Sequence, residues 1–221
     1  MASLQFSSIK TGSCSVKLTG LDSSWDGGAR YVYYYFDTGG YPSEDDYSNY
    51  ARGSNVSNGS SSGGNASVSG LSAGTKYYCK CYIYYNKKIE TEMGSYTETT
   101  LLSTVKGTFY TRPYDWSWYT DIRSTSYIPV DKYGFHPVTA TEWNDFTSRI
   151  NEFRLYAGFS TYSFTTVSQH QQFTPAIYNQ AVKAIKGING YGAYLNEINS
   201  NTVLCASIFT SLASELNAVS I

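Results

Sequence analysis

The stretch LSAGTKYYCKCYIYYNKK, residues 71–88, decides the fold of the first half of the chain. Beyond Thr75, every second residue is aromatic, small or branched and apolar: Tyr77, Cys79, Cys81 and Ile83. This period of two is typical of a β-strand with one buried face. Asn86-Lys87-Lys88 interrupts the pattern, so we expect the strand to end in a turn there and the next strand to lie within 89–102.

The segments before this stretch have the same character. Residues 13–21 alternate apolar and polar side chains, and residues 29–37 are a run of aromatic and branched residues between glycine pairs. Residues 66–70 have the pattern of a short strand, whereas 41–64 is mostly too hydrophilic to bury and is expected to be a loop with at most an edge strand. Together these strands predict a β-sandwich.

The order Leu71-x-x-Gly74-Thr75-x-Tyr77, leading into a strand, resembles the corner at the E–F crossing of fibronectin type III and immunoglobulin-like domains. The resemblance covers about residues 4–103. It implies that the hydroxyl of Tyr77 forms a hydrogen bond to the backbone that precedes it.

Two further features bear on which of the two kinds of domain this is. Tyr77-x-Cys79 matches the immunoglobulin spacing, with Cys14 as the cysteine that would pair with Cys79; the alternative is two small buried thiols. Trp25, the candidate core tryptophan, lies before the C strand and not within it. The fibronectin type III-like interpretation is therefore preferred.

Strand phase predicts a tyrosine-rich outer face. If Tyr77 and its alternating neighbours point inward, and Val32, Tyr34 and Phe36 do so on the C strand, six tyrosines point outward: Tyr31, Tyr33, Tyr35, Tyr78, Tyr82 and Tyr84. Strands C and F are neighbours in this fold, so all six share one face. Half exposure would leave an apolar patch on the order of 500 Å². We interpret it as a contact face for a subunit, the second domain or a ligand; the alternative is ordinary cross-strand pairs that stabilise the sheet.

The second half has the pattern of helices. Thr139-Ala-Thr-Glu142 is a capping box, and Gly158 is suited to end that helix. A second helix is expected to begin at Thr174, with Pro175 in its first turn, and a third lies within 202–219. Each helix has an apolar stripe on one side: Trp143, Phe146, Ile150, Phe153 and Ala157; Ile177, Ala181, Ala184 and Ile185 or Ile188; Leu204, Ile208, Leu212 and Leu216. Striped helices of roughly 15 residues are stable only when the stripes pack together, which predicts a compact helical domain.

An extended aromatic lead-in precedes these helices. Trp116 and Trp118 are two residues apart, which places both rings on one side of an extended segment. We interpret them as a cover for the helices, and the alternative is a surface pair that stacks on sugar rings. Residues 159–167 also alternate and predict a short strand or an extended cover.

The predicted fold class is therefore α+β with two domains. A fibronectin type III or immunoglobulin-like β-sandwich occupies residues 1–103, and a mainly α-helical domain with its aromatic lead-in occupies 104–221. The predicted linker lies around 103–108, where the character of the sequence changes.

Four phrases in the second half carry a second resemblance: TRPYDWSW, TATEWNDFTSRINEFRLY, FTPAIYNQAV and ASIFTSLASELN. Together they resemble the C-terminal region of prophage-encoded structural proteins of gut Firmicutes phages, which is often carried behind a fibronectin type III-like or immunoglobulin-like module. This resemblance spans about residues 108–219. It implies a virion setting, in a tail, baseplate or capsid decoration, and an oligomeric context, but it transfers no catalytic or binding residues.

Composition excludes several classes of function. Charged residues make up 15% of the chain, against roughly 25% in ordinary soluble proteins, and the net charge is −1. We therefore expect no nucleic-acid partner. No apolar run is long enough to cross a bilayer, and the first residues lack the pattern of a signal peptide. We therefore expect a protein made in the cytoplasm without membrane insertion. The second resemblance implies that the host is bacterial and that the protein is located in the virion.

The sequence contains no catalytic motif. Its two histidines, His136 and His170, are not spaced as metal ligands, and neither a nucleophile elbow nor a phosphate-binding loop occurs. Glu44, Asp45 and Asp46 are interpreted as a solvated acidic loop; the alternatives are a Ca²⁺ site or paired carboxylates. We expect no enzyme, no cofactor and no metal.

Two functional hypotheses follow. The first is a structural virion protein whose domains hold copies of this chain and other virion proteins together. The second is a receptor- or glycan-binding module for host attachment, which would use the tyrosine face, the pair Trp116 and Trp118, or the loop 41–65 to bind a host surface sugar. A hydrolase of the lysin type is a weaker third alternative.

Overall fold

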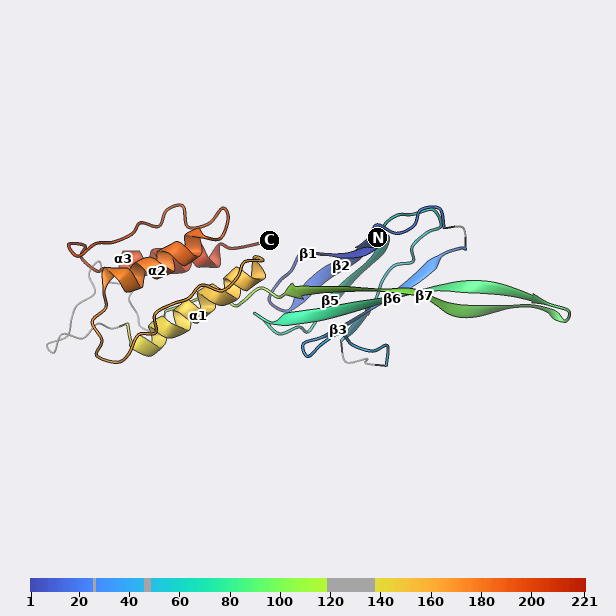
Figure 1. The fold of residues 1–221 in the computed structure, drawn as a ribbon, viewed down its shortest axis with the longest axis horizontal. Coiled ribbons are helices and arrows are strands. Elements are labelled where there is room, and N and C mark those ends of the chain that lie inside the picture. The colour runs from blue at the N-terminus through green and yellow to red at the C-terminus, as the bar shows by residue number, and fades with distance from the viewer. Residues whose placement is uncertain (26, 46–48, 119–137) are drawn as a thin grey trace. The chain divides into compact units, whose positions relative to one another are not determined.

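The computed structural model describes residues 1–25, 27–45, 49–118 and 138–221. The chain forms two compact units that divide between Arg112 and Pro113 (Figure 1). The first unit contains the strands β1 (Ser3–Ser7), β2 (Ser13–Thr19), β3 (Arg30–Asp37), β4 (Tyr50–Arg52), β5 (Gly63–Ser69), β6 (Lys76–Thr91) and β7 (Gly94–Tyr110). The second contains the helices α1 (Ala140–Tyr156), α2 (Pro175–Lys186) and α3 (Ala206–Asn217). The predicted α+β fold class is confirmed.

The first unit is a sandwich of two antiparallel sheets. One sheet has the strand order β1-β2-β5 and the other has the order β4-β3-β6-β7. The short β4 lies beside β3, in the sheet that also contains β6 and β7. In an immunoglobulin constant-type domain the fourth strand joins the opposite sheet, so the strand order favours the fibronectin type III-like interpretation.

The predicted strand phases place the core between the two sheets. Val32, Tyr34 and Phe36 on β3 are buried, and so are Cys79 and Ile83 on β6. A tyrosine is tolerated there because the Tyr34 hydroxyl donates a hydrogen bond of 2.6 Å to the carbonyl oxygen of Gly64 in the opposite sheet. Gly64 has φ +66°, and a Cβ at this position would lie 3.0 Å from the Tyr34 hydroxyl, which explains the glycine.

The corner before β6 forms as predicted. The backbone N–H of Ser72 donates a hydrogen bond of 2.9 Å to the hydroxyl of Tyr77. The Tyr77 ring stacks on Phe109 of β7, with ring centroids 5.7 Å apart. Trp25 is half-buried and is not a core residue; its ring packs edge-on against Tyr85, and its indole N–H donates a hydrogen bond to the Gly28 carbonyl oxygen.

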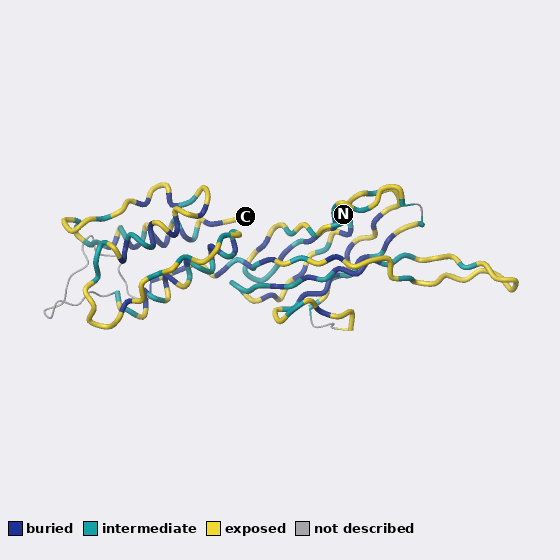
Figure 2. Tube along the Cα trace, in the orientation of Figure 1, coloured by how far each residue is buried: buried dark blue, intermediate teal, exposed yellow. Residues whose placement is uncertain are grey.

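The end of β6 corrects a prediction. Asn86-Lys87-Lys88 forms no turn; β6 continues to Thr91 and pairs with β7 from Gly94 onward. Cross-strand partners explain the continuation, because Lys87 lies opposite Glu98 and Ile89 lies opposite Tyr96. Figure 1 shows that the two strands extend beyond the rest of the sandwich as a two-stranded ribbon, and Figure 2 shows most of that ribbon as exposed. We call residues 86–99, which lie beyond the last pair of β3 with β6, the β6–β7 ribbon.

The position of the boundary also differs from the prediction. Residues 103–108 lie inside β7 and pair with β6, so the break at 103/104 falls within a strand. Val105 and Phe109 of this part of β7 are buried in the sandwich core. The change in sequence character that predicted a linker here falls within an edge strand of the sheet.

In the second unit, local signals set the helix ends as predicted. The Thr139 hydroxyl accepts a hydrogen bond of 3.1 Å from the backbone N–H of Glu142, and Gly158 follows α1 with φ +82°. Thr174 caps α2 in the same way, with Pro175 in its first turn. The α3 stripe is displaced from the prediction: the buried residues are Ala206, Phe209, Leu212, Ala213 and Leu216. Leu204 precedes this helix and is half-buried.

Residues 159–167 form the extended cover and no strand. Two asparagines of α1 hold this segment in place. Asn151 accepts a hydrogen bond of 2.6 Å from the backbone N–H of Tyr162 and donates one of 3.1 Å to its carbonyl oxygen. Asn144 makes the same pair of bonds with Val167, both at 2.9 Å. The side-chain amides thus replace the strand partner that this backbone would otherwise need.

Candidate functional site

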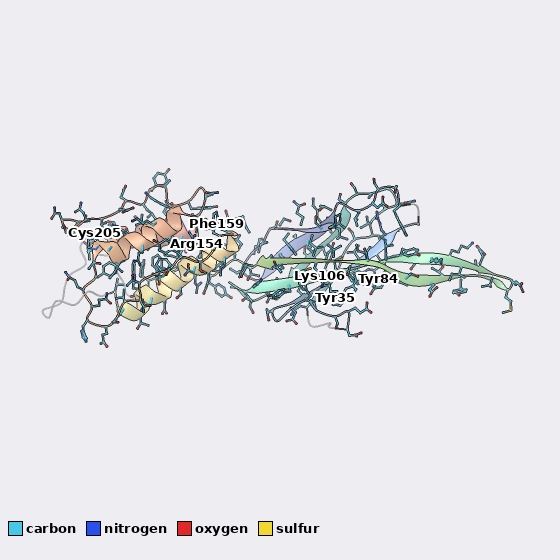
Figure 3. All side chains as sticks on the ribbon, viewed as in Figure 1. Tyr35, Tyr84, Lys106, Arg154, Phe159 and Cys205 are labelled. Atoms are coloured by element: carbon cyan, nitrogen blue, oxygen red, sulfur yellow. The ribbon has the colours of Figure 1, made fainter. Side chains whose placement is uncertain are left out.

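The predicted tyrosine face exists on the sheet of β3 and β6. Tyr31 lies opposite Tyr84 and Tyr33 lies opposite Tyr82 in the antiparallel register, so their side chains share the face that points away from the sandwich core. Figure 3 labels Tyr35 and Tyr84 among the side chains of this sheet. The face is less exposed than strand phase predicted, since Tyr35 is 6% exposed and Tyr82 is 5% exposed.

A loop of the chain itself covers one end of this face. Tyr41 packs edge-on against Tyr78 with ring centroids 5.2 Å apart. The Tyr82 hydroxyl donates a hydrogen bond of 3.3 Å to the carbonyl oxygen of Pro42, and the Tyr84 hydroxyl donates one to the carboxylate of Glu44. Tyr78 and Tyr82 therefore contact the loop that joins β3 to β4, which the sequence could not place.

The uncovered part of the face is a groove of about 470 Å³. We call it the tyrosine groove, and it is lined by Tyr31, Tyr33, Tyr35, Tyr50, Arg52, Tyr84, Asn86 and Thr99. Strand phase predicted four of these side chains: Tyr31, Tyr33, Tyr35 and Tyr84. The other four come from β4, in the segment expected to be a loop with at most an edge strand, and from the base of the β6–β7 ribbon, where Asn86 was expected in a turn and Thr99 in the next strand.

The short edge strand β4 forms one wall of the tyrosine groove. Tyr50 lies opposite Tyr35 and Arg52 lies opposite Tyr33, which places both β4 side chains on the tyrosine face. The rings of Tyr35 and Tyr50 stack with centroids 5.9 Å apart, and the guanidinium carbon of Arg52 lies 5.9 Å from the centre of the Tyr33 ring. Tyr50 remains 48% exposed, so this wall offers an aromatic surface to a ligand.

A chain of hydrogen bonds forms the other wall. The Thr99 hydroxyl donates a bond of 3.1 Å to the side-chain oxygen of Asn86, whose amide nitrogen donates one of 3.0 Å to the hydroxyl of Tyr31. This chain crosses from β7 through β6 to β3. It fixes the orientation of the Asn86 amide, and it could form only because β6 runs past the predicted turn.

Burial, followed by the hydrogen bond to Glu44, raises the pKa of Tyr84 well above its usual range. Arg52 carries the only formal charge among the described lining residues, which otherwise form an aromatic and polar surface with this cation at its edge.

Trp116 and Trp118 do not belong to this site. Each is 7% exposed and lies in the core of the helical unit. The Trp118 ring packs on Phe146 of α1, with ring centroids 4.7 Å apart, and its indole N–H donates a hydrogen bond of 3.1 Å to the carbonyl oxygen of Phe209. The ring of Trp116 packs edge-on against that of Trp118, with centroids 5.4 Å apart. The pair therefore covers the helices, as preferred from the sequence, and has no ring face open to a sugar.

The three cysteines of the sandwich are not accessible from its surface. Cys14, Cys79 and Cys81 are buried free thiols, so the Cys14–Cys79 bridge is not formed. Burial raises the pKa of Cys14 to about 12, which keeps this thiol protonated. Within the described ranges, no three His, Cys, Asp or Glu side chains are grouped as metal ligands. Asp46 and His136 lie outside the described residues.

No family model and no curated protein matches the chain. Three solved structures with sandwich folds are similar to it. A computationally redesigned β-sandwich protein is 11% identical, with a TM-score of 0.31 over 52% of this chain and 90% of the other. The fn3 domain of the human collagen α-1(XX) chain is 18% identical, with a TM-score of 0.28 over 52% and 82%. The sensor domain of an anti-sigma factor from Pseudobacteroides cellulosolvens is 16% identical, with a TM-score of 0.29 over 60% and 88%. Similarities this low say nothing of function.

Proposed function

We propose that the chain is a non-enzymatic binding module and that its tyrosine groove holds a glycan of a host cell surface. The observation that carries this proposal is the groove itself, in which five tyrosines converge with Arg52, Asn86 and Thr99. Its volume of about 470 Å³ lies within the range of ligand sites in proteins. Tyrosine offers a large amphipathic contact at low entropic cost, which suits a ring that is apolar on its faces and polar at its edge.

The lining residues favour binding over catalysis. Among the residues that the structure describes, they include no carboxylate, histidine or cysteine, which are the side chains that most often act as general bases or nucleophiles. The carboxylate of Glu44 accepts a hydrogen bond from Tyr84 and does not line the groove. The remaining polar groups can orient a ligand by hydrogen bonds.

The test is a saccharide-binding screen of the full-length chain with paired tyrosine variants. Tyr50→Ala removes an exposed ring of the tyrosine groove, and Tyr96→Ala removes a ring of similar exposure, 55%, from the β6–β7 ribbon outside the groove. We expect at least one saccharide to bind, with roughly tenfold or greater loss for Tyr50→Ala, since central aromatic contacts dominate binding energy. Equal loss in both variants, or no binding by the unaltered chain, would contradict the proposal.

We also propose the setting that the sequence of the helical unit implies, a bacteriophage virion in which this chain contacts other virion proteins. The support is the resemblance carried by four phrases of residues 108–219. Among the described residues, no helix is both long and apolar enough to cross a bilayer. Mass spectrometry of purified particles from the host strain should detect the chain, and its presence only in the soluble host fraction would contradict this setting.

A second candidate function, assembly of copies of this chain, is favoured by the β6–β7 ribbon. A two-stranded ribbon is marginally stable alone in water, and this one exposes Met93 and Tyr96 at its far end. A contact with another chain would bury these side chains. Light scattering after size exclusion should give a multiple of the chain mass of 24.5 kDa. A monomer at all concentrations would contradict assembly and leave the binding proposal intact.

A further inference from the structure

The tyrosine groove contains one cation without a carboxylate partner. Within the described residues, no ion pair involves Arg52, whose guanidinium lies over the ring of Tyr33. Arg52 is exposed, so its five N–H donors are accessible to a ligand. The planar guanidinium fork matches a carboxylate with two parallel hydrogen bonds. This edge of the groove is therefore suited to one carboxylate.

The opposite wall has unused hydrogen-bonding capacity. Asn86 has two amide N–H donors and a carbonyl oxygen with two lone pairs, of which the bonds to Tyr31 and from Thr99 use one each. One amide N–H and one lone pair remain. The Tyr31 hydroxyl accepts from Asn86 and keeps its own proton to donate. These groups can bind neighbouring hydroxyls that both donate and accept hydrogen bonds.

The floor and one wall between these polar edges are aromatic. Tyr33 and Tyr35 come from β3, and Tyr50 stacks beside Tyr35 with about half of its surface open. A ligand that matches the whole groove has an apolar ring face, several hydroxyls on one side and one carboxylate on the other. A polyphosphate or nucleic acid is a poorer match, since it needs several cations and this groove has one.

We infer that the ligand of the tyrosine groove is a saccharide that carries a carboxylate, of the uronic or nonulosonic acid class. The carboxylate binds the guanidinium of Arg52, the sugar ring lies against Tyr33 and Tyr50, and its hydroxyls bind Asn86 and Tyr31. This inference rests on the proposed glycan-binding function and adds the chemical class of the sugar.

The test compares matched ligands on the full-length chain by calorimetry. Oligosaccharides of uronic and nonulosonic acids are each measured beside their carboxyl-reduced forms, together with neutral glucans. We expect the acidic form to bind at least about tenfold tighter than its reduced form, as for other hydrogen bonds to charged groups. The difference should shrink as the salt concentration rises.

Two variants assign the effect to Arg52. Arg52→Gln should abolish the difference between acidic and reduced ligands, and Arg52→Lys should recover only part of it because lysine lacks the planar fork. Thermal unfolding checks that these exposed substitutions leave the fold intact. Lys87→Gln, a charge change on the β6–β7 ribbon outside the groove lining, is the matched control.

Each outcome is decisive. Equal binding of acidic and reduced forms, or acidic binding that survives Arg52→Gln, overturns this inference and leaves the proposed glycan-binding function in place. Absence of binding to every acidic and neutral saccharide overturns the proposed function as well.

Discussion

Replacing Arg154 by methionine should weaken the attachment of α1 to its partners in the helical unit. The Arg154 side chain is buried, with its Nη1 donating a hydrogen bond of 2.6 Å to the carbonyl oxygen of Ala184 and its Nε donating one of 2.9 Å to that of Ser160. Ala184 lies in the last turn of α2, where the helix dipole favours a positive charge. The guanidinium thus joins α1 to α2 and to the extended segment, and Figure 3 shows Arg154 on α1.

The size of the effect follows from these two bonds. Hydrogen bonds that involve a charged group contribute about 1.5 to 3 kcal/mol each. Methionine keeps a long apolar side chain, so the cavity that remains is small, but the carbonyl oxygen of Ala184 loses a buried partner. We therefore expect Arg154→Met to lower the free energy of unfolding of the helical unit by about 3 kcal/mol, a large part of the 5 to 15 kcal/mol of a typical domain.

Urea denaturation followed by tryptophan fluorescence measures this effect, because Trp116, Trp118 and Trp143 all report on the helical unit. Lys183→Met on α2 is the control, since its ion pair with Glu197 is exposed and should contribute less than about 1 kcal/mol. A loss for Arg154→Met no larger than that of the control would refute the reasoning.

Three further predictions concern both units. Tyr77→Phe should lower the stability of the sandwich by about 1 kcal/mol, because it removes one hydrogen bond and keeps the stacked ring; an unchanged urea midpoint would contradict this. Burial raises the pKa of Tyr178 to about 12, above the value near 10 of an unfolded chain, so the stability it contributes below pH 10 should be lost between pH 10 and 12, and Tyr178→Phe should flatten that dependence in melting curves. Burial also raises the pKa of Tyr34, so the stability of the sandwich should likewise fall as the pH rises above 10. A fragment of residues 1–112 should fold alone by circular dichroism, whereas 1–103 should not, because it lacks the buried end of β7; a folded 1–103 would show that this end is dispensable.

Local signals in the sequence determined much of this protein. The alternation from Tyr77 to Ile83 sets which side chains enter the core, and Thr139 and Thr174 set where two helices begin. These features depend on neighbours within one turn of helix or a few positions along a strand, and such neighbours are visible in the sequence.

Only the tertiary structure decided the other half of the site, the four lining residues that strand phase did not predict. The turn predicted at Asn86 is absent because pairing with β7 outweighs the local preference of asparagine and lysine for a turn. This pairing brings Thr99 to Asn86 and then to Tyr31, which lies 55 positions away along the chain. The same holds for Arg52, which reaches the groove only because β4 joins the edge of β3. Contacts between residues so far apart depend on how strands associate, and no local pattern encodes that association.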